Sequence, residues 1–310
     1  MSAFTAPIIS QPQQYDMGHL WKLFVEFQSL QLEPTTIYAN YNVVGNIIRR
    51  LPTKSLAHAA KIRSWLVQNT SQLMAWRYLL RFDQCCRWAV DEGLIESNPF
   101  ANLKIKKPKG SSGACKAFSI DQRDLIIQSF EDHEQHKHYA SLIKFLFWTG
   151  CRHGEAFALL WKDISPCCQF ITFSKSRNLL GLEKSTKNRK TRIFQCSSDS
   201  RLHSLLVSLS ASRTEESYVF TTIRGRPVCS TLLGYAWNRS KDGLPGVIRD
   251  LECKGVPYLK PYSTRHTFAT WAIALGATPD KVAYWIGDDT ETVLRYYVHP
   301  EVSKSACPDF

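Results

Sequence analysis

Three separated segments of this chain carry most of the side chains that could do chemistry. The first, residues 149–164, places Arg152 at a turn flanked by glycines, with Glu155 one helical step away on the same face. The second is a basic segment around Lys187, and the third, residues 261–299, is rich in arginine, histidine and tyrosine. Clustered cations of this kind favour an anionic partner.

The charge balance gives the same indication. The chain has 310 residues, with 39 lysines and arginines against 27 aspartates and glutamates, a net charge of +12. Nucleic acid is the simplest polyanionic partner, although charge alone also fits an anionic membrane surface. The sequence has no uninterrupted apolar run of the roughly 18 residues that a spanning helix needs, and its start does not resemble a secretory signal. No membrane partner is expected.

In their order and spacing, the motifs resemble those of the tyrosine recombinases, also called phage integrases. T-G-x-R-x-x-E…L-x-W-x-D-I at 149–164 is similar to the family's first arginine motif, and R-H-T-F-A-T at 265–270 to the second. I-G…T…Y-x-H at 286–299 is similar to the nucleophile motif. These motifs cover the C-terminal part of the chain. The N-terminal part is similar to the family's core-binding domains, with a less diagnostic pattern.

The resemblance implies DNA cleavage and rejoining through a 3′-phosphotyrosyl intermediate, with no metal, ATP or other cofactor. Arg152 and Arg265 would bind the non-bridging oxygens of the phosphodiester, which gain negative charge in the transition state. Lys187 matches the family's hairpin lysine and would protonate the departing 5′ oxygen as general acid. Lys184 and Lys190 are alternatives if the register differs.

Two adjacent tyrosines compete for the role of nucleophile. Consecutive helical residues point about 100° apart, so only one of them can face the phosphate. Tyr297 has the family's distance from Gly287 and stands in the Y-x-H pattern, so it is the expected nucleophile. Tyr296 is expected to be a packing residue.

Two positions depart from the commonest family pattern. Tyr262 stands where most members have histidine, and a phenol with a reference pKa near 10 accepts a proton less readily than imidazole. Asp288 stands where histidine or tryptophan usually donates to the phosphate. Because a carboxylate facing a phosphate is repulsive, Asp288 is expected to turn outward or to pair with a cation. Both are included among the catalytic-site residues as the weakest members.

The sequence gives no support for a metal site or for nucleotide hydrolysis. The ten cysteines include two adjacent pairs but no C-x-x-C turn, and are interpreted as reduced thiols, mostly in the core. The cluster of His133, His136 and His138 is interpreted as a solvated helix end. No phosphate loop of the G-x-x-x-x-G-K-[ST] type is present.

The pattern of elements predicts a two-domain, mainly α protein. Residues 1–14 form a tail, 15–103 a helical core-DNA-binding bundle (SAM-like by resemblance), 104–117 a basic linker, and 118–310 a mixed α/β catalytic domain with a small antiparallel sheet. Hydrophobic periodicity predicts N-terminal helices at 16–30, 34–51 and 55–68, and a fourth with Leu73, Leu79, Phe82 and Ala89 on one face.

The C-terminal part alternates helices with short strands. The predicted helices are 120–131, 139–149, 154–161, 200–210, 230–240, 264–275, 279–286 and 290–298. The predicted strands are 169–174 and 192–196, with a third at 218–221.

Basic side chains outside the motifs are candidates for contact with the DNA backbone. Four lysines of the linker precede a Gly/Ser stretch: Lys104, Lys106, Lys107 and Lys109. The linker is either a flexible, soluble spacer or a basic strap that crosses the phosphates and closes a clamp on the duplex. Arg189 and Lys190, beside Lys187, are expected to bind phosphate as well.

The resulting hypothesis is a site-specific integrase of a phage or mobile element. It would act in the bacterial cytoplasm or nucleoid, as a homotetramer on double-stranded DNA with paired half-sites. The alternative is a catalytically weak or inactive DNA-binding accessory protein with the same fold, which Tyr262 and Asp288 favour. A type IB topoisomerase would relax supercoiled plasmid without a sequence requirement. A basic regulator without chemistry would leave the ordered spacing of the three motifs unexplained.

Overall fold

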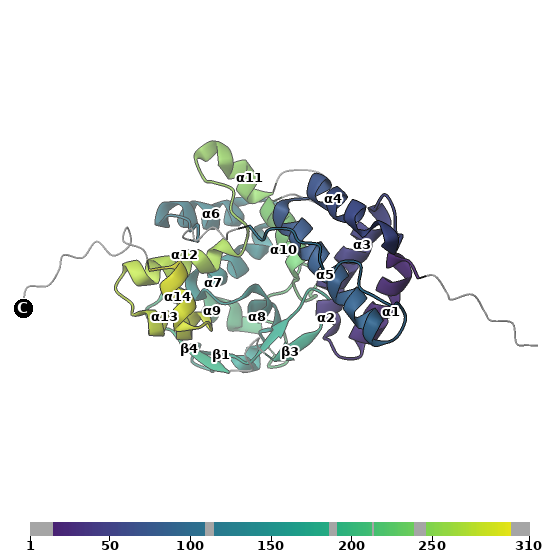
Figure 1. Ribbon diagram of the computed structural model, residues 1–310. Coiled ribbons are helices and arrows are strands. Elements are labelled where there is room, and N and C mark those ends of the chain that lie inside the picture. Colours follow the sequence, from purple (N-terminus) through teal and green to yellow (C-terminus); the bar gives the residue numbers. More distant parts are fainter. Residues whose placement is uncertain (1–14, 109–114, 186–190, 213, 239–245, 299–310) are drawn as a thin grey trace, which may run out of the picture. The chain divides into compact units, whose positions relative to one another are not determined.

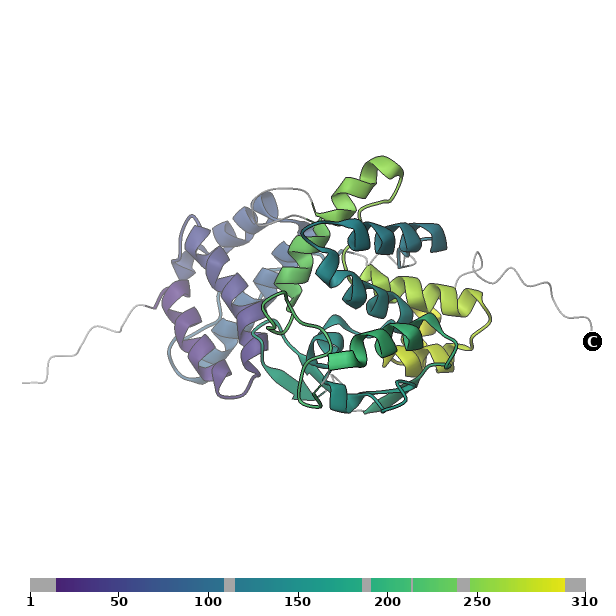
Figure 2. The ribbon, with the colours of Figure 1, turned by 180° about the vertical axis from the view of Figure 1, so that it is seen from behind.

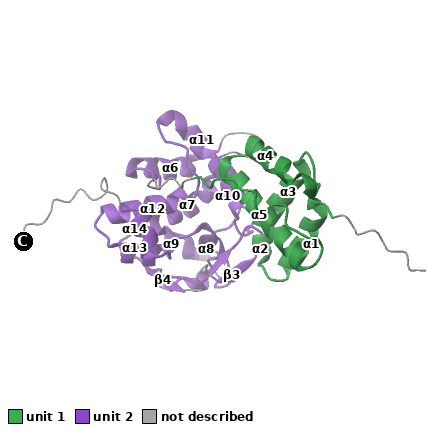
Figure 3. Ribbon diagram, in the orientation of Figure 1, with its two compact units in different colours: residues 1–111 green, residues 112–310 purple. Residues whose placement is uncertain are grey.

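The computed structural model describes residues 15–108, 115–185, 191–212, 214–238 and 246–298. The chain divides into two compact units, residues 1–111 and 112–310 (Figure 3). The division falls inside the basic segment 104–117. Among the described residues, no helix is both long and apolar enough to cross a bilayer.

Unit 1 is built of helices. They are α1 (Met17–Ser29), α2 (Pro34–Thr36), α3 (Asn42–Arg50), α4 (Ala59–Asn69) and α5 (Gln72–Asp91), with a π-helical turn at Ile37–Tyr41 between α2 and α3. Local chemistry sets where they begin: the Asp16 carboxylate accepts from the His19 amide at 2.8 Å and caps α1. The Ser71 hydroxyl caps α5 in the same way. The four predicted N-terminal helices are confirmed, the second of them interrupted by the π-turn.

Aromatic side chains form much of the core of unit 1. Trp21 stacks on Tyr41 with ring centroids 5.6 Å apart, and Phe82 packs against Phe100 at 5.6 Å. Phe82 is fully buried on the inner face of α5. Leu73, predicted to share that face, is 37% exposed because it lies in the first turn of α5, where fewer neighbours cover it.

The last described residues of unit 1 lie against its helices. Leu103 and Ile105 pack partly buried on the hydrophobic core, while Lys104 and Lys106 are exposed. The carbonyl of Lys106 accepts a hydrogen bond from the Gln72 side chain at 3.0 Å. The start of the predicted linker is therefore part of the folded unit.

Unit 2 contains the remaining helices and all of the strands described (Figure 1). The helices are α6 (Ile120–Asp132), α7 (Ala140–Thr149), α8 (His153–Ala158), α9 (Arg201–Leu209), α10 (Ser230–Asn238), α11 (Val247–Leu251), α12 (Ser263–Ala274), α13 (Pro279–Ile286) and α14 (Thr290–Tyr296). The strands are β1 (Phe170–Phe173), β2 (Lys175–Arg177), β3 (Glu183–Ser185) and β4 (Arg192–Gln195). All eight predicted helices are present; α11 was not predicted.

The strands form two small antiparallel pairs. β1 pairs with β4, and β2 pairs with β3, so a second hairpin is inserted between the two strands that the sequence predicted. The third predicted strand, 218–221, is wrong: only isolated bridges occur there, such as Leu160 with Tyr218. The ladder cannot extend because its partner segment turns into the 3₁₀ helix Trp161–Asp163.

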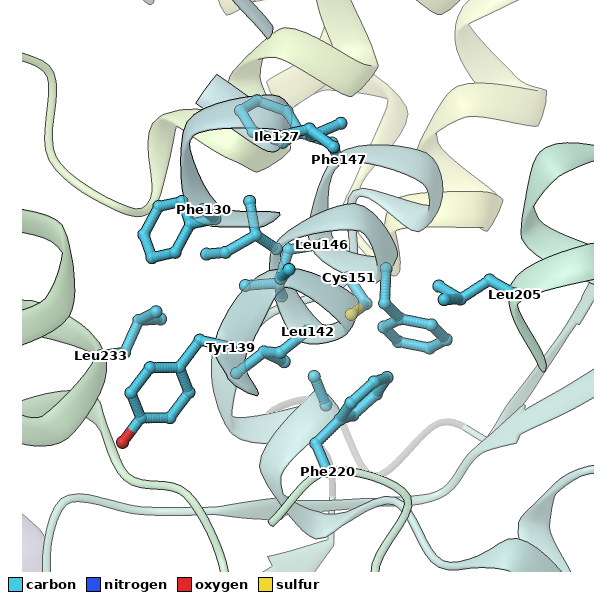
Figure 4. Packing of buried hydrophobic residues seen from close by; sticks show 14 of the residues in the cluster. Ile127, Phe130, Tyr139, Leu142, Leu146, Phe147, Cys151, Leu205, Phe220 and Leu233 are labelled. Carbon is cyan, nitrogen blue, oxygen red and sulfur yellow. The ribbon is translucent and has the colours of Figure 1, made fainter. Parts of the chain in front are cut away.

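The apolar helix α7 lies at the centre of the hydrophobic core of unit 2. Figure 4 shows its side chains Leu142 and Leu146 among Phe130, Phe220 and others drawn from the surrounding elements. Because side chains of the surrounding elements pack against α7 on several sides, the position of its C-terminal end is well defined. The residues that follow it, 150–155, are positioned accordingly.

Helices α12, α13 and α14 gather at one end of unit 2, as both views show in yellow (Figure 1 and Figure 2). The segment 115–118 connects two of them. The Cys115 amide donates to the Tyr296 carbonyl at 3.4 Å, and the Phe118 amide donates to Thr267 Oγ1 at 3.0 Å. The Trp271 indole donates in turn to the Phe118 carbonyl at 2.9 Å. The first described residues of unit 2 thus fasten α12 to the end of α14.

Candidate active site

A left-handed turn after α7 presents Arg152. Gly150 ends the helix with φ +60°, and a Cβ there would lie 2.4 Å from the Phe268 ring, so both the backbone and the space require glycine. Arg152 is the N-cap of α8. Its amide donates to Glu155 Oε2 at 2.9 Å, and its guanidinium lies 3.3 Å from Glu155 Oε1.

A second arginine, from a strand, binds the carboxylate of Glu155. Arg192, on β4, donates two hydrogen bonds to its carboxylate, at 3.0 and 2.7 Å, and both side chains are buried. Burial alone raises the pKa of Glu155, but the hydrogen bonds and charge of Arg192 outweigh it and lower the pKa below its ordinary value. Glu155 is therefore an ionised support for Arg152 rather than a proton donor.

Arg265 is fully buried in α12 and ties three segments together. Its Nη1 donates to the Gly150 carbonyl at 3.0 Å and also to the carbonyl of Ile286, at the end of α13. Its Nε finds no hydrogen-bond acceptor among the described residues. The guanidinium is thus fixed by backbone carbonyls and keeps donor capacity for another acceptor.

The carboxylate of Asp288 lies between the two site arginines. Its Oδ2 accepts from Arg265 Nη2 at 2.7 Å and lies 3.6 Å from Arg152 Nη2. The expectation that Asp288 pairs with a cation is confirmed, and the pairing involves two cations. Segments more than a hundred residues apart therefore converge on one anionic oxygen.

Tyr297 lies at the C-cap of α14 and is only 3% exposed. Its hydroxyl lies 2.8 Å from Nδ1 of His266, the residue after Arg265. Burial raises the pKa of Tyr297, against the opposing charge of Arg265, so the phenol is protonated at neutral pH. Burial and then the charge of Arg265 lower the pKa of His266 to about 4, so its imidazole is neutral. In the tautomer of the neutral imidazole that carries its hydrogen on Nε2, Nδ1 accepts the phenol O–H of Tyr297.

Tyr262 lies at the start of α12 with 39% of its surface exposed. Its ring centroid is 5.2 Å from that of His266 and 5.8 Å from that of His153, in edge-to-face contacts. The guanidinium carbon of Arg265 lies 6.0 Å from the ring centroid. Tyr262 therefore borders the same cluster as Tyr297.

The structure thus brings together five of the six predicted catalytic-site residues: Arg152, Arg265, Tyr262, Asp288 and Tyr297. Lys187, the sixth, lies outside the described residues, as do Arg189, Lys190 and Lys109. The alternative Lys184 is an exposed residue of β3. Lys104, Lys106 and Lys107 belong to unit 1, where the Lys107 ammonium lies 5.1 Å from the centre of the Trp76 ring.

Sequence reasoning missed two residues of this cluster. The R-H-T-F-A-T motif gives His266 no role of its own, and because consecutive helical residues point about 100° apart, its place beside Arg265 does not predict its contact with Tyr297. The sequence predicts Arg192 to be a strand residue, and nothing local indicates that its charge is directed inward to Glu155.

This arrangement is suited to chemistry on an anionic ester. Two guanidiniums share one anion position, and a phenol with a ring nitrogen to accept its proton lies in the same cluster. Among the described residues, no group of three or more His, Cys, Asp or Glu side chains is placed to hold a metal ion.

Comparison with known sequences identifies similar proteins. Residues 116–304 match the family model described as "Phage integrase family". The chain is 23% identical over 242 residues to prophage integrase IntR of Escherichia coli (strain K12), covering 70% of this chain and 54% of that protein. It is 24% identical over 219 residues to tyrosine recombinase XerC of Pediococcus pentosaceus, covering 69% and 66%. The alignment thus spans about half of the first relative and just under two thirds of the second.

Solved structures show the same fold. The Tn1549 transposon integrase, in complex with a circular intermediate DNA, superimposes with a TM-score of 0.71 at 16% identity, covering 92% of this chain and 95% of that chain. The lambda integrase tetramer bound to a Holliday junction gives a TM-score of 0.68 at 14% identity, covering 91% and 80%. At these identities the likeness establishes the fold, and the expected fold class is confirmed.

Proposed function

This chain belongs to the phage integrase family, and from that premise we propose that it is a site-specific DNA recombinase that forms a 3′-phosphotyrosyl intermediate. Its biological role would be the integration or excision of a phage or mobile element. The reaction conserves the energy of the phosphodiester in the link to tyrosine, so the mechanism requires no ATP.

One observation carries the proposal: two guanidiniums from distant segments converge on a single anionic oxygen, Oδ2 of Asp288. A non-bridging phosphate oxygen requires the same arrangement of donors, and preorganised charge stabilises the transition state without reorganisation. We assign Arg152 and Arg265 to that role. Asp288 would hold them in place until the phosphate displaces it.

The other roles follow from the chemistry of strand cleavage. We assign Tyr297 as the nucleophile, because its hydroxyl contacts the ring nitrogen of His266, the residue next to Arg265, and the charge of Arg265 acts on it. Lys187 is proposed as the general acid that protonates the 5′ oxygen. Tyr262 would donate a hydrogen bond to a phosphate oxygen from its exposed position at the start of α12.

The proposed partner is duplex DNA with paired half-sites, bound by a homotetramer in the bacterial cytoplasm or nucleoid. The two structural relatives described above were solved on DNA, one of them as a tetramer. We propose that residues 15–103 bind the core DNA and that residues 118–310 catalyse. Lys104, Lys106, Lys107, Lys109, Arg189 and Lys190 are proposed as contacts to the phosphate backbone.

Covalent trapping tests the proposal. Duplexes from the DNA flanking the coding region, chosen for inverted repeats with a short spacer, are nicked near the spacer so that cleavage releases a short strand and cannot be reversed. The wild-type protein is expected to give a denaturation-resistant protein–DNA adduct, and Tyr297→Phe is expected to give none while still binding DNA. Loss of the adduct with Tyr296→Phe instead would move the nucleophile by one residue.

A catalytically silent DNA-binding protein is the second candidate, because the carboxylate of Asp288 neutralises the position that a phosphate would occupy. Binding of the flanking duplex by a wild-type protein that gives no adduct would favour this candidate. Relaxation of any supercoiled plasmid, independent of its sequence, would instead indicate a topoisomerase.

A further inference from the structure

We propose that His266 is a catalytic residue: its Nδ1 takes the proton of the Tyr297 hydroxyl as that oxygen attacks phosphorus. This inference rests on the proposed function and extends it to a residue outside the predicted site. The observation behind it is the 2.8 Å contact between the two atoms. A general base has to lie within hydrogen-bond reach of the proton that it removes, and this contact meets that condition.

The surroundings of His266 leave its ring nitrogen free to accept. The Arg265 guanidinium, on the adjacent residue, disfavours a second positive charge on the imidazole. The ring is also partly buried, with its edge against the Tyr262 ring. In the described contacts Nδ1 has the Tyr297 hydroxyl as its hydrogen-bond partner, so the tautomer with hydrogen on Nε2 fits the geometry.

Tyr262 is the alternative proton acceptor, since it stands at the position of the family's histidine. Its hydroxyl makes no hydrogen bond to another residue within the described parts of the chain, whereas Nδ1 of His266 already faces the reacting oxygen. A phenol is also a weaker acceptor than imidazole at neutral pH. The geometry therefore favours the histidine one turn further along α12.

The proposed step balances in bonds and protons. A bond forms between the Tyr297 oxygen and phosphorus, and the bond from phosphorus to the 5′ oxygen breaks. The phenol proton passes to Nδ1 of His266, while the 5′ oxygen takes a proton from the general acid proposed above. No electron acceptor is needed. In rejoining, the imidazolium returns its proton to the tyrosine oxygen as the 5′ hydroxyl attacks.

The test compares two nicked duplexes, one with the natural 5′-oxygen leaving group and one with sulfur in its place. Sulfur departs without being protonated, so it relieves the need for a general acid but not for a base. The wild-type protein is expected to form an adduct on both. His266→Ala and His266→Asn are expected to be slower on both by on the order of 100-fold, the scale of general base catalysis. Added imidazole should restore part of the rate of His266→Ala.

The outcomes separate the alternatives. Absence of any wild-type adduct refutes the proposed function itself. Full rates for His266→Asn refute proton transfer, because asparagine can accept the hydrogen bond but not the proton. Recovery of the variants on the sulfur substrate would show that His266 acts on the leaving group instead, which also refutes the proposal.

Folding is controlled independently. His203→Asn, on α9, changes a half-buried histidine of the same unit and is expected to keep the wild-type rate. Thermal unfolding and noncovalent binding of uncleaved duplex verify that the His266 variants are folded. The near-isosteric His266→Asn keeps the test decisive if His266→Ala unfolds.

Discussion

Asp288 shows how a single side chain can set the resting state of a charged site. Its carboxylate oxygen lies 2.7 Å from one guanidinium and 3.6 Å from another, so the free protein neutralises its own anion position. Such pairing holds the arginines in a defined geometry and avoids leaving two adjacent cations unpaired. If Arg152 and Arg265 bind the phosphate as proposed, DNA has to compete with this internal carboxylate.

Replacing that carboxylate tests the competition. Asp288→Asn removes the negative charge at similar size, and the rate of adduct formation is expected to rise by about tenfold, the equivalent of one charge-assisted hydrogen bond. The adduct rate on the nicked duplex measures it. Asp289→Asn changes the exposed neighbour and serves as the control. A folded Asp288→Asn protein slower than wild type would contradict the prediction and give the carboxylate a supporting role.

At the scale of residues, the sequence predicts which residue types belong to the site better than it predicts where their side chains point. Coulomb repulsion alone predicts that Asp288 either turns outward or pairs with a cation, and the structure shows the second of these. The contact of His266 with Tyr297 depends on how α12 and α14 pack, and the inward direction of Arg192 depends on the strand register. Neither is encoded in the neighbouring residues.

At the scale of elements, the site is built from the ends of helices rather than from their middles. α7 ends at Gly150, α13 ends at Gly287, and Tyr297 follows α14. Long periodic helices such as α5 could be predicted closely, because their apolar faces are continuous. The hairpin β2–β3 could not, since its strands are short, β2 is half-buried, β3 is exposed, and neither carries an apolar alternation.

The turn at Gly287 is predicted to be sensitive to a single methyl group. Its φ is +67°, and a Cβ there would lie 2.6 Å from Arg192 Nη1. Gly287→Ala is therefore expected to cost about 1 kcal/mol of backbone strain plus about 1–3 kcal/mol of overpacking. Gly276 has a φ of +92° with no atom within 4 Å, so Gly276→Ala should show the strain alone. Urea unfolding measures the loss of unfolding free energy in both variants. Equal losses would contradict the predicted clash at Gly287.

The buried pair of Arg192 and Glu155 is predicted to matter far more than exposed pairs. Arg192→Leu leaves the Glu155 carboxylate, which is 1% exposed, with only the more distant Arg152 guanidinium as an ion-pair partner, and about 3 kcal/mol of unfolding free energy is expected to be lost. Arg295→Leu breaks an exposed pair with Glu291 on α14 and should cost less than about 1 kcal/mol. If the two variants lose similar amounts of unfolding free energy in urea, the buried pair is not a stronger support for this part of the fold than an exposed pair, which would contradict the prediction.

At the scale of the whole molecule, two neutral histidines make stability depend on pH. Burial lowers the pKa of His153 and of His266 to about 4, from 6.5. The unfolded chain therefore binds protons more readily, and stability present above pH 6.5 is lost as the pH falls towards 4. Each histidine is expected to account for on the order of 2 kcal/mol. Between pH 7 and pH 4.5, the unfolding free energy of His266→Asn should decrease less than that of the wild type. Equal decreases would contradict the contribution of His266.

Salt dependence tests the basic side chains at the end of unit 1. Lys104 and Lys106 line a groove of about 630 Å³ with Arg63 and Gln72. If both contact phosphates, Lys104→Ala with Lys106→Ala should weaken binding of every duplex and reduce the slope of log affinity against log salt by about 2. The control is the double variant Lys22→Ala with Lys54→Ala, which removes the same amount of positive charge from two other exposed positions. An unaltered slope would remove these lysines from the interface.

The segment 115–118 makes hydrogen bonds both to the helix that carries Arg265 and to the residue next to Tyr297. Through Phe118 it is bonded to α12, which carries Arg265, and through Cys115 to the residue before Tyr297. The arginine proposed to stabilise charge and the proposed nucleophile are thus linked to the same four residues, the first that the structure describes in unit 2. A displacement of the whole stretch would therefore disturb the helix that carries Arg265 and the residue next to Tyr297 together.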